Sequence, residues 1–340
     1  MYNFIMMVSL QIFAETQTTQ LEGLSAEMKT FYDMTLIDEA SANLVHAQFG
    51  QKKPIPAHGG KTIEFRKFAP LEKALTPITE GVPPAGKALE VTTITATVNQ
   101  YGDFIKMSDV LDLTAIDPVV VEATKLIGRQ AGLTLDTVVR NVLNSGTNVF
   151  YCPKVAADGT ETAVTSRSGL DTTCGLTVDV VMQVAAKLEA QNAPKIDGHY
   201  VAIIHPLMAY QLMRDKDWER AHVYTTPENI YEGELGRIAG VRFVKSSEAK
   251  IFGSDDGAPK GLGVFSTIIF GADAFGVTEV AGGGLKTIIK QKGSAGTADP
   301  LDQVSSVGWK AMLTAEILIP RYLVRVEGCS AKFSPNLAAN

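Results

Sequence analysis

Residues 117–146 read DPVVVEATKLIGRQAGLTLDTVVRNVLNSG, and this stretch decides how the rest of the chain is organised. Side chains suited to one buried helix face recur in it at steps of three and four residues: Val120, Ala123, Ile127, Ala131, Thr134, Leu135, Val138 and Val142. Asp117 and Pro118 are typical of the N-cap and the first helical position, and Gly146 is typical of a helix end. The pattern predicts one helix of about 27 residues, roughly 40 Å long, across which other segments lie.

Gly128 and Gly132 fall inside this predicted helix. Glycine weakens a helix locally because its backbone has more freedom to lose on folding. We therefore expect either close packing of another segment or a bend at these two positions.

The composition is that of an ordinary globular protein. The chain has 340 residues, 45% of them hydrophobic and 20% charged, with a formal net charge of −6. This length predicts two domains with a large core, and the composition argues against a disordered or fibrous protein. The negative charge argues against a general nucleic-acid binder. The apolar start, residues 1–13, lacks a basic region and a cleavage site and is too short to span a bilayer. We expect it either to dock on another subunit or to be disordered.

The next two segments differ in charge and in pattern. Residues 1–50 form an acidic arm with modest helices, one of which begins near Ser25. Residues 61–68 and 89–98 alternate apolar and polar side chains, which predicts two strands. The proline- and glycine-rich residues 69–87 between them are too long for a loop inside a compact domain, and two strands alone bury too little apolar surface. We predict a long hairpin that projects from the body and lies on another subunit.

This hairpin is basic. A basic hairpin would meet an acidic arm or edge of a neighbour, whereas the plainer alternative is that its lysines form a solvated face. The residues expected to make contacts between subunits are Lys61, Ile63, Phe65, Arg66, Lys67, Phe68, Lys73 and Lys87.

A linker at residues 151–175 precedes a second unit. Its expected helices are residues 177–190, a helix from Pro206 through Trp218, and residues 226–240. Its expected strands are residues 200–204, 241–245, 262–270 and 285–291. The alternating pattern of residues 307–319, continued to Val326, predicts strands that return along the long helix. The second unit is then an insertion into the first.

Motifs with a known chemistry are absent from the sequence: it has no phosphate-binding glycine loop, HExxH, GxSxG or kinase set. His199 and His205 flank a predicted strand about 20 Å apart, so they cannot share a metal unless the strand bends. His205-Pro206 is better interpreted as a strand-to-helix corner, and Asp255-Asp256 as a plain turn. The three cysteines, Cys152, Cys174 and Cys329, are an odd number without a CxxC pair, and we predict that they are scattered reduced thiols. We expect no cofactor, metal or catalytic residue, and keep open a cytosolic enzyme with a cleft around His199 or His205.

Five longer motifs carry a resemblance. They are LSAEMKTFYD at residues 24–33, GKTIEFRKF at 60–68, IHPLMAYQLMRD at 204–215, YEGELGRIAGVRF at 231–243 and KQKGSAGTADPL at 290–301. The chain resembles the major capsid proteins of tailed bacteriophages, in the family typified by the coat protein of coliphage N-four. The likeness extends from about Leu24 to Val326 and leaves the first residues out.

The resemblance implies an α+β capsid fold of the Hong Kong ninety-seven type. Its parts would be an N-terminal arm (1–50), an extended loop (51–104), a peripheral domain (105–175) with the spine helix at 118–145, an axial domain (176–303), and peripheral return strands with the C-terminus (304–340). It also implies hexamers and pentamers that close into an icosahedral virion shell around double-stranded DNA, assembled in the host cytoplasm. A portal, and scaffolding or decoration proteins, would be its partners. The alternative within this fold is a nanocompartment that encloses protein cargo.

Overall fold

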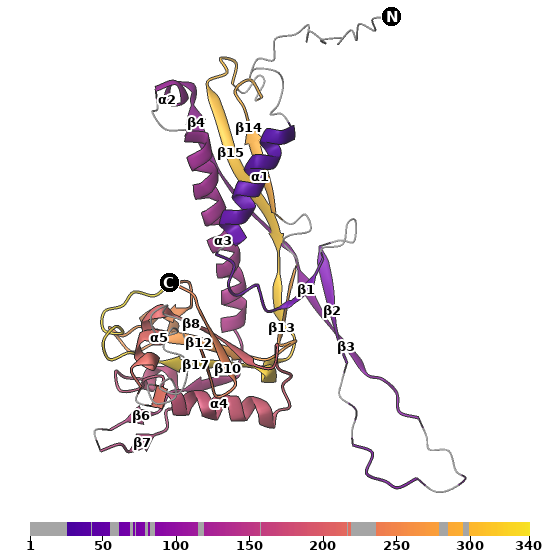
Figure 1. Ribbon diagram of the computed structural model, residues 1–340, viewed down its shortest axis with the longest axis vertical. Helices are drawn as coiled ribbons and strands as arrows, with labels where there is room; N and C mark the ends of the chain where they lie inside the picture. Colours follow the sequence, from indigo (N-terminus) through magenta and orange to yellow (C-terminus); the bar gives the residue numbers. More distant parts are fainter. Residues whose placement is uncertain are drawn as a thin grey trace, which may run out of the picture.

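The computed structural model describes residues 26–340 except 42, 55–60, 69–70, 72, 79–80, 82–85, 115–118, 157, 216, 219–235, 279–284 and 295–298. An elongated body is built on one long helix, with a rounded lobe at one end and a hairpin that projects sideways (Figure 1). Within the described part of the chain, no helix combines the length and the apolar character that crossing a membrane requires.

The predicted long helix is α3, Val119–Asn144, which we call the spine helix. Its expected N-cap, Asp117, lies outside the described residues. Four of the residues predicted for its inner face are fully buried: Ala123, Ile127, Ala131 and Leu135. Farther along, Val139 and Leu143 are buried in place of Val138 and Val142, which are only partly buried. The buried surface is wider than one stripe because two different elements cover the helix.

The first of these elements is helix α1, Ala26–Ser41, which crosses the spine helix at the two glycines. A Cβ atom on Gly132 would lie 2.5 Å from the carbonyl oxygen of Ala40, and one on Gly128 would lie 3.0 Å from that of Leu36. Close packing, one of the two expectations for these glycines, is therefore confirmed.

The second element is a three-stranded antiparallel sheet in the order β14 (Leu285–Lys290), β15 (Val304–Leu313) and β4 (Asn99–Ser108). Alternate residues of β15 are buried against the spine helix: Val307, Trp309, Ala311 and Leu313. The indole nitrogen of Trp309 donates to Oε1 of Gln130 on the spine helix at 3.3 Å. The prediction that a late strand returns along the helix is right for β15. Helix α2 (Asp109–Thr114) follows β4.

The lobe contains a seven-stranded sheet. Its main order is β5 (Val149–Tyr151), β17 (Leu323–Gly328), β12 (Val264–Phe270), β8 (Tyr200–Ile204), β10 (Val241–Lys245) and β9 (Arg237–Ile238), with β11 (Ile251–Phe252) paired to β12. Every residue of β8, β12 and β17 is buried. Such continuous burial is expected for strands covered on both faces.

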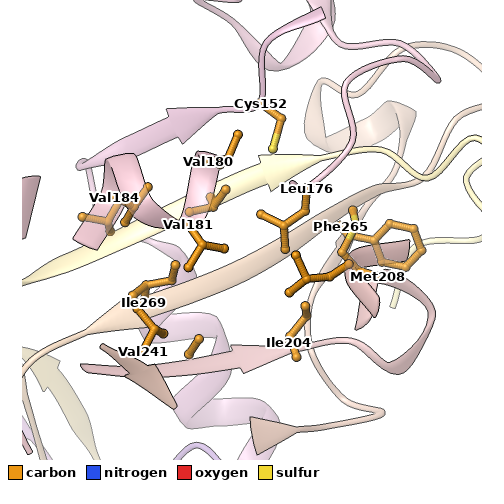
Figure 2. Packing of buried hydrophobic residues seen from close by; sticks show 14 of the residues in the cluster. Cys152, Leu176, Val180, Val181, Val184, Ile204, Met208, Val241, Phe265 and Ile269 are labelled. Atoms are coloured by element: carbon orange, nitrogen blue, oxygen red, sulfur yellow. The ribbon is translucent and has the colours of Figure 1, made fainter. Parts of the chain in front are cut away.

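Two clusters of buried residues cover these faces. On one face, helices α4 (Val178–Ala190) and α5 (Pro206–Met213) pack against Tyr200, Ala202 and Ile204 of β8 (Figure 2). On the other face, Val201 and Ile203 of the same strand belong to the cluster that contains the buried spine residues. Alternate side chains of β8 therefore pack into the lobe core and into the cluster of the spine helix, and so the strand connects the lobe to the body.

The projecting hairpin consists of β2 (Thr62–Phe68) and β3 (Val91–Thr97), which pair antiparallel as predicted. Beside its base, β1 (Gln51–Lys53) pairs with β13 (Phe275–Thr278), which also pairs with β16 (Ala315–Ile317). A second, short hairpin on the lobe joins β6 (Lys154–Val155) and β7 (Glu161–Thr162). Single turns of 3-10 helix occur at Arg167–Gly169, Ser254–Asp256 and Pro320–Tyr322.

The elements cross the expected domain boundaries at three places. The range 51–104 includes β1, which is paired inside the body, and the start of β4, so the projecting part is narrower than expected. Strand β14 falls within the range expected for the axial domain but pairs beside the spine helix. In the range 304–340, β15 and β16 contact the spine helix, while β17 lies inside the lobe sheet.

The expected helices and strands of the lobe are mostly present, with three differences. The helix that begins at Pro206 ends at Met213 and does not extend through Trp218. The single run expected at 307–319 is divided between β15 and β16. The helix expected at 226–240 lies outside the described residues as far as residue 235, and its described end is wrong, because Arg237–Ile238 forms the strand β9.

The close approach of α1 to the spine helix gives a test. Gly132→Val should lower the free energy of unfolding by about 1–3 kcal/mol, because the added carbons meet the backbone of Ala40 and one of the two helices must move. Chemical denaturation of the unassembled subunit measures the change. The matched control is Gly86→Val, where nothing lies within 4 Å of the added Cβ. Equal stabilities of the two variants would contradict the packing described.

Candidate assembly surfaces

The base of the projecting hairpin is fixed to its own subunit by an aromatic side chain. Phe65 and Ile63 are each only 2% exposed, and they form a small apolar cluster with Ala96 and Leu318. The Phe65 ring lies over Gly276 of β13, where a Cβ atom would be 2.4 Å from the ring. The ammonium group of Lys53 lies 5.7 Å from the centre of the same ring. The hairpin therefore leaves the body in a defined direction.

The residues expected to contact neighbours separate into two groups. Ile63 and Phe65 are used inside the subunit, so their side chains are not available to a neighbour in this conformation. Lys61, Arg66, Lys73 and Lys87 are exposed. Lys67 and Phe68 pair through their backbone with Thr92 and Val91, and their side chains lie outside the described ones.

The outer part of the hairpin also exposes large apolar side chains. Leu75 is 82% exposed, Ile78 is 75% exposed, Leu89 is 67% exposed and Leu71 is 62% exposed. Isolated exposed leucines are common, but several on one projecting segment indicate a surface that a partner covers. Sequence reasoning concentrated on the lysines and missed this group, although leucine and isoleucine recur between the prolines of residues 71–89.

The arm is joined to the spine helix by a buried polar pair. Asp136 accepts from the backbone N–H of His46 at 2.7 Å, and its second oxygen lies 2.7 Å from Nδ1 of the same histidine. Both residues are fully buried. Nearer the start of the arm, Arg129 and Glu39 form an exposed ion pair at 2.9 Å. This buried pair could not be predicted from a local pattern, because its two residues are ninety positions apart.

A buried cluster of charges joins the lobe to the end of the spine helix. Glu327 of β17 is fully buried and accepts two hydrogen bonds from Arg167, each at 2.7 Å. Nε of Arg325 also lies 2.7 Å from this carboxylate, and its Nη1 donates to the carbonyl oxygen of Asn144, the last spine residue. Asn144 in turn accepts from the hydroxyl of Ser266 at 2.6 Å. The network spans four segments that are distant in sequence.

The pKa values of the two arginines of this cluster shift in opposite directions, although both contact the same carboxylate. Hydrogen bonding to Glu327 raises the pKa of Arg167. Burial lowers the pKa of Arg325 and outweighs the attraction of Glu327. Arg167 also lies over the ring of Phe252, with 3.6 Å between its guanidinium carbon and the ring centre. Glu327 therefore serves as a shared structural anion and not as a reactive group.

The three cysteines converge, which corrects the prediction that they are scattered. Cys152, Cys174 and Cys329 are free and fully buried around Gly328, where a Cβ atom would lie 2.8 Å from the Cys152 sulfur. Cys329 donates its backbone N–H to the carbonyl of Cys174 at 2.8 Å. Burial raises the pKa of the Cys329 thiol to about 12 and also raises that of Cys152. Neutral buried thiols are poor nucleophiles, so the cluster belongs to the core.

The histidines of the enzyme alternative do not form a catalytic group. His205 is the N-cap of α5 and accepts from the Leu207 N–H at 3.2 Å, as expected for a strand-to-helix corner. Burial lowers its pKa. His199 contacts Arg237 at 2.9 Å, at the opposite end of β8. Asp215 accepts from the Val178 N–H at the start of α4. Among the described residues, no group of three histidine, cysteine or acidic side chains could hold a metal ion.

A family model described as phage capsid protein matches residues 90–326. The chain belongs to this family. No curated protein matches the sequence. The fold is also similar to solved capsids: that of Ralstonia phage GP4, at 14% identity with a TM-score of 0.64 over 98% of this chain and 100% of that one, and that of cyanophage P-SCSP1u, at 15% identity and 0.62 over 84% and 88%. A third is the capsid of cyanophage Pam1, at 12% identity and 0.60 over 98% and 100%.

These findings confirm the fold and the function that the sequence motifs implied. The chain is a phage major capsid protein with the capsid fold of the Hong Kong ninety-seven type, and its role is structural. The enzyme alternative receives no support from the family or from the arrangement of the described histidines.

The buried charge cluster gives a second test. Glu327→Ala should destabilise the subunit by about 3–5 kcal/mol, because two arginines would remain in the core without their anion. Glu189→Ala is the matched control, since Glu189 forms an exposed pair with Lys195 and should cost less than about 1 kcal/mol. Both values come from denaturant unfolding of purified subunits. A small effect at Glu327 would show that the network is not needed for the lobe to join the spine helix.

Proposed function

We propose that copies of this capsid protein assemble through hexamers and pentamers into an icosahedral shell that encloses double-stranded phage DNA. The observation that carries the proposal is the hairpin, whose base is anchored by Phe65 while its outer part exposes Leu75 and Ile78. A single subunit leaves this apolar surface in water. A neighbouring copy that covered it would gain the free energy of apolar burial at each contact, and many such contacts add up around a shell.

Charge supports the same arrangement. Lys61, Arg66, Lys73 and Lys87 are exposed on or beside the hairpin. Helix α1 carries four acidic residues and one lysine, and α2 carries two aspartates and no basic residue. A basic hairpin of one subunit would therefore be attracted to an acidic arm or edge of another.

Each part of the subunit would have the role that the capsid fold implies. The projecting part of the extended loop (51–104) would lie on a neighbouring subunit. The arm (1–50), whose helix α1 packs on its own spine helix, would form the wall together with the peripheral domain (105–175 and 304–340) and the axial domain (176–303). A net charge of −6 suits a wall that does not bind packaged DNA tightly. A portal and scaffolding or decoration proteins would complete the virion, and assembly would take place in the host cytoplasm.

The hairpin can be tested by deletion. Removing residues 69–87 should leave a folded subunit, because β2 and β3 keep their register and the Phe65 cluster is untouched, but closed particles should no longer form. Negative-stain microscopy and size-exclusion chromatography separate particles from subunits, and circular dichroism checks folding. Closed particles formed by the deletion variant would refute the contact between subunits. Nuclease-resistant DNA in wild-type particles purified from infected cells separates a virion shell from a nanocompartment with protein cargo.

The electrostatic part has its own test. The triple variant Lys61→Glu, Arg66→Glu and Lys67→Glu should assemble less than wild type, with the largest deficit at low ionic strength, where charges are least screened. Light scattering at a series of salt concentrations follows assembly. Replacing the same three residues with Gln is the matched control, because it removes attraction without adding repulsion and should have an intermediate effect. Assembly that is indifferent to both changes at low salt would remove charge from the proposal and leave the apolar surface as its basis.

A further inference from the structure

The three-stranded sheet beside the spine helix has an outer face that the described chain leaves uncovered. Odd-numbered residues of its strands face the helix, as the contacts of Trp309 and Asp103 with Gln130 show. Even-numbered residues face the other way. On that side, Phe104 is 58% exposed and Ile288 is 42% exposed, both large apolar side chains in contact with solvent.

The register of the strands arranges this outer face in rows. The middle row is Ile288, Gly308 and Phe104. The row on one side of it is Lys290, Ser306 and Lys106, and the row on the other side is Lys286, Lys310 and Gly102. Rows two residues apart along a strand are about 6.8 Å apart, so two rows of lysine lie about 13 Å from each other with an apolar row between them. We call these three rows the lysine face.

The positive charge of this face is not balanced within the described chain. No described carboxylate lies in the three rows, and none forms an ion pair with any of the four lysines. The nearest aspartate in the sequence of β4, Asp103, points to the helix side, where hydrogen bonding by Gln130 lowers its pKa. Lys286 and Lys310 are directly opposite each other on neighbouring strands, an arrangement that costs stability through like-charge repulsion. No described carboxylate of the same subunit offsets this repulsion.

The centre of the lysine face is hollow. A Cβ atom on Gly308 would lie 2.8 Å from Cβ of Phe104, and one on Gly102 would lie 2.6 Å from the carbonyl oxygen of Trp309. The strands therefore approach too closely for side chains at these positions. The result is a shallow depression lined by both glycines, Phe104, Ile288 and Lys310.

We infer that the lysine face is a docking surface for an acidic segment of another protein chain, with an apolar side chain at its centre. The central side chain would occupy the depression between Phe104 and Ile288, and carboxylates two residues to either side would reach the two rows of lysine. Nucleic acid fits less well, because a sugar–phosphate backbone would bury no apolar group against the middle row, whereas stacking of bases would need them unpaired. The inference goes beyond shell formation and concerns a different surface from the hairpin.

A peptide of defined sequence tests whether an acidic segment with a central apolar side chain binds to the lysine face. The probe is a fluorescent peptide with the central order Glu-Ser-Phe-Ser-Glu, and the comparison probe replaces its phenylalanine with serine. Fluorescence anisotropy with the full-length protein at low salt should show binding, with the serine peptide about tenfold weaker. The double variant Lys286→Glu and Lys310→Glu should weaken binding of both peptides by about tenfold or more. Phe104→Ser should remove the preference for the phenylalanine peptide.

Control variants and a nucleic-acid probe distinguish specific docking of the peptide from a general charge effect and from nucleic-acid binding. Lys260→Glu makes the same kind of charge reversal at one exposed lysine in the lobe and should leave binding unchanged. Circular dichroism and thermal unfolding of each variant should match those of wild type, since all the changed side chains are exposed. Absence of peptide binding, or equal loss on Lys260→Glu, would overturn the inference. A 20-base-pair duplex that binds more tightly than the peptides and depends on Lys286 and Lys310 would overturn it in favour of nucleic acid.

Discussion

The structure depends on the burial of one 26-residue helix from two sides. A helix of this length has only a limited stability of its own in water, so its order comes from what covers it. On one side, α1 can approach because Gly128 and Gly132 have no side chains, and on the other side the odd-numbered residues of β15 form an apolar layer. Neither cover would be stable without the helix. The arm, the sheet and the helix therefore form one cooperative unit, although they come from widely separated parts of the sequence.

Buried polar groups then determine how this unit is joined to the rest. His46 with Asp136 fixes the position of the arm, and Glu327 with Arg325 fixes the lobe to the end of the spine helix. Buried ion pairs are seldom stabilising overall, because desolvation offsets much of their attraction. Their geometry is selective, however, since a shifted register would leave a charge in the core without its partner. Such contacts suit a shell protein, in which each subunit must present its outer surfaces at reproducible angles.

The sequence predicted what depends on local pattern and missed what depends on distant partners. The spine helix, the hairpin strands and the His205 corner follow from periodicity, capping and alternation, which are local. The assignment of β17 to the lobe could not be predicted, because β15 and β17 both alternate and nothing in either pattern specifies which strand pairs with it. The same reason explains the unforeseen convergence of the three cysteines and of the charges around Glu327. The exposed leucines of the hairpin were visible in the sequence, but only the structure shows that no described part of their own subunit covers them.

The two exposed surfaces of the subunit differ in a way that argues for different partners. The hairpin joins large apolar side chains to a long projecting segment, so it can reach a neighbour and bury a substantial area there. The lysine face lies on a sheet supported from behind by the spine helix, where Trp309 and Gln130 fix the strands. A rigid, shallow and charged face does not project from the subunit, so only a segment of a partner that extends to it can bind there. The hairpin is therefore suited to reach a neighbouring subunit, whereas the lysine face is suited to receive a partner segment, because the spine helix supports its sheet from behind.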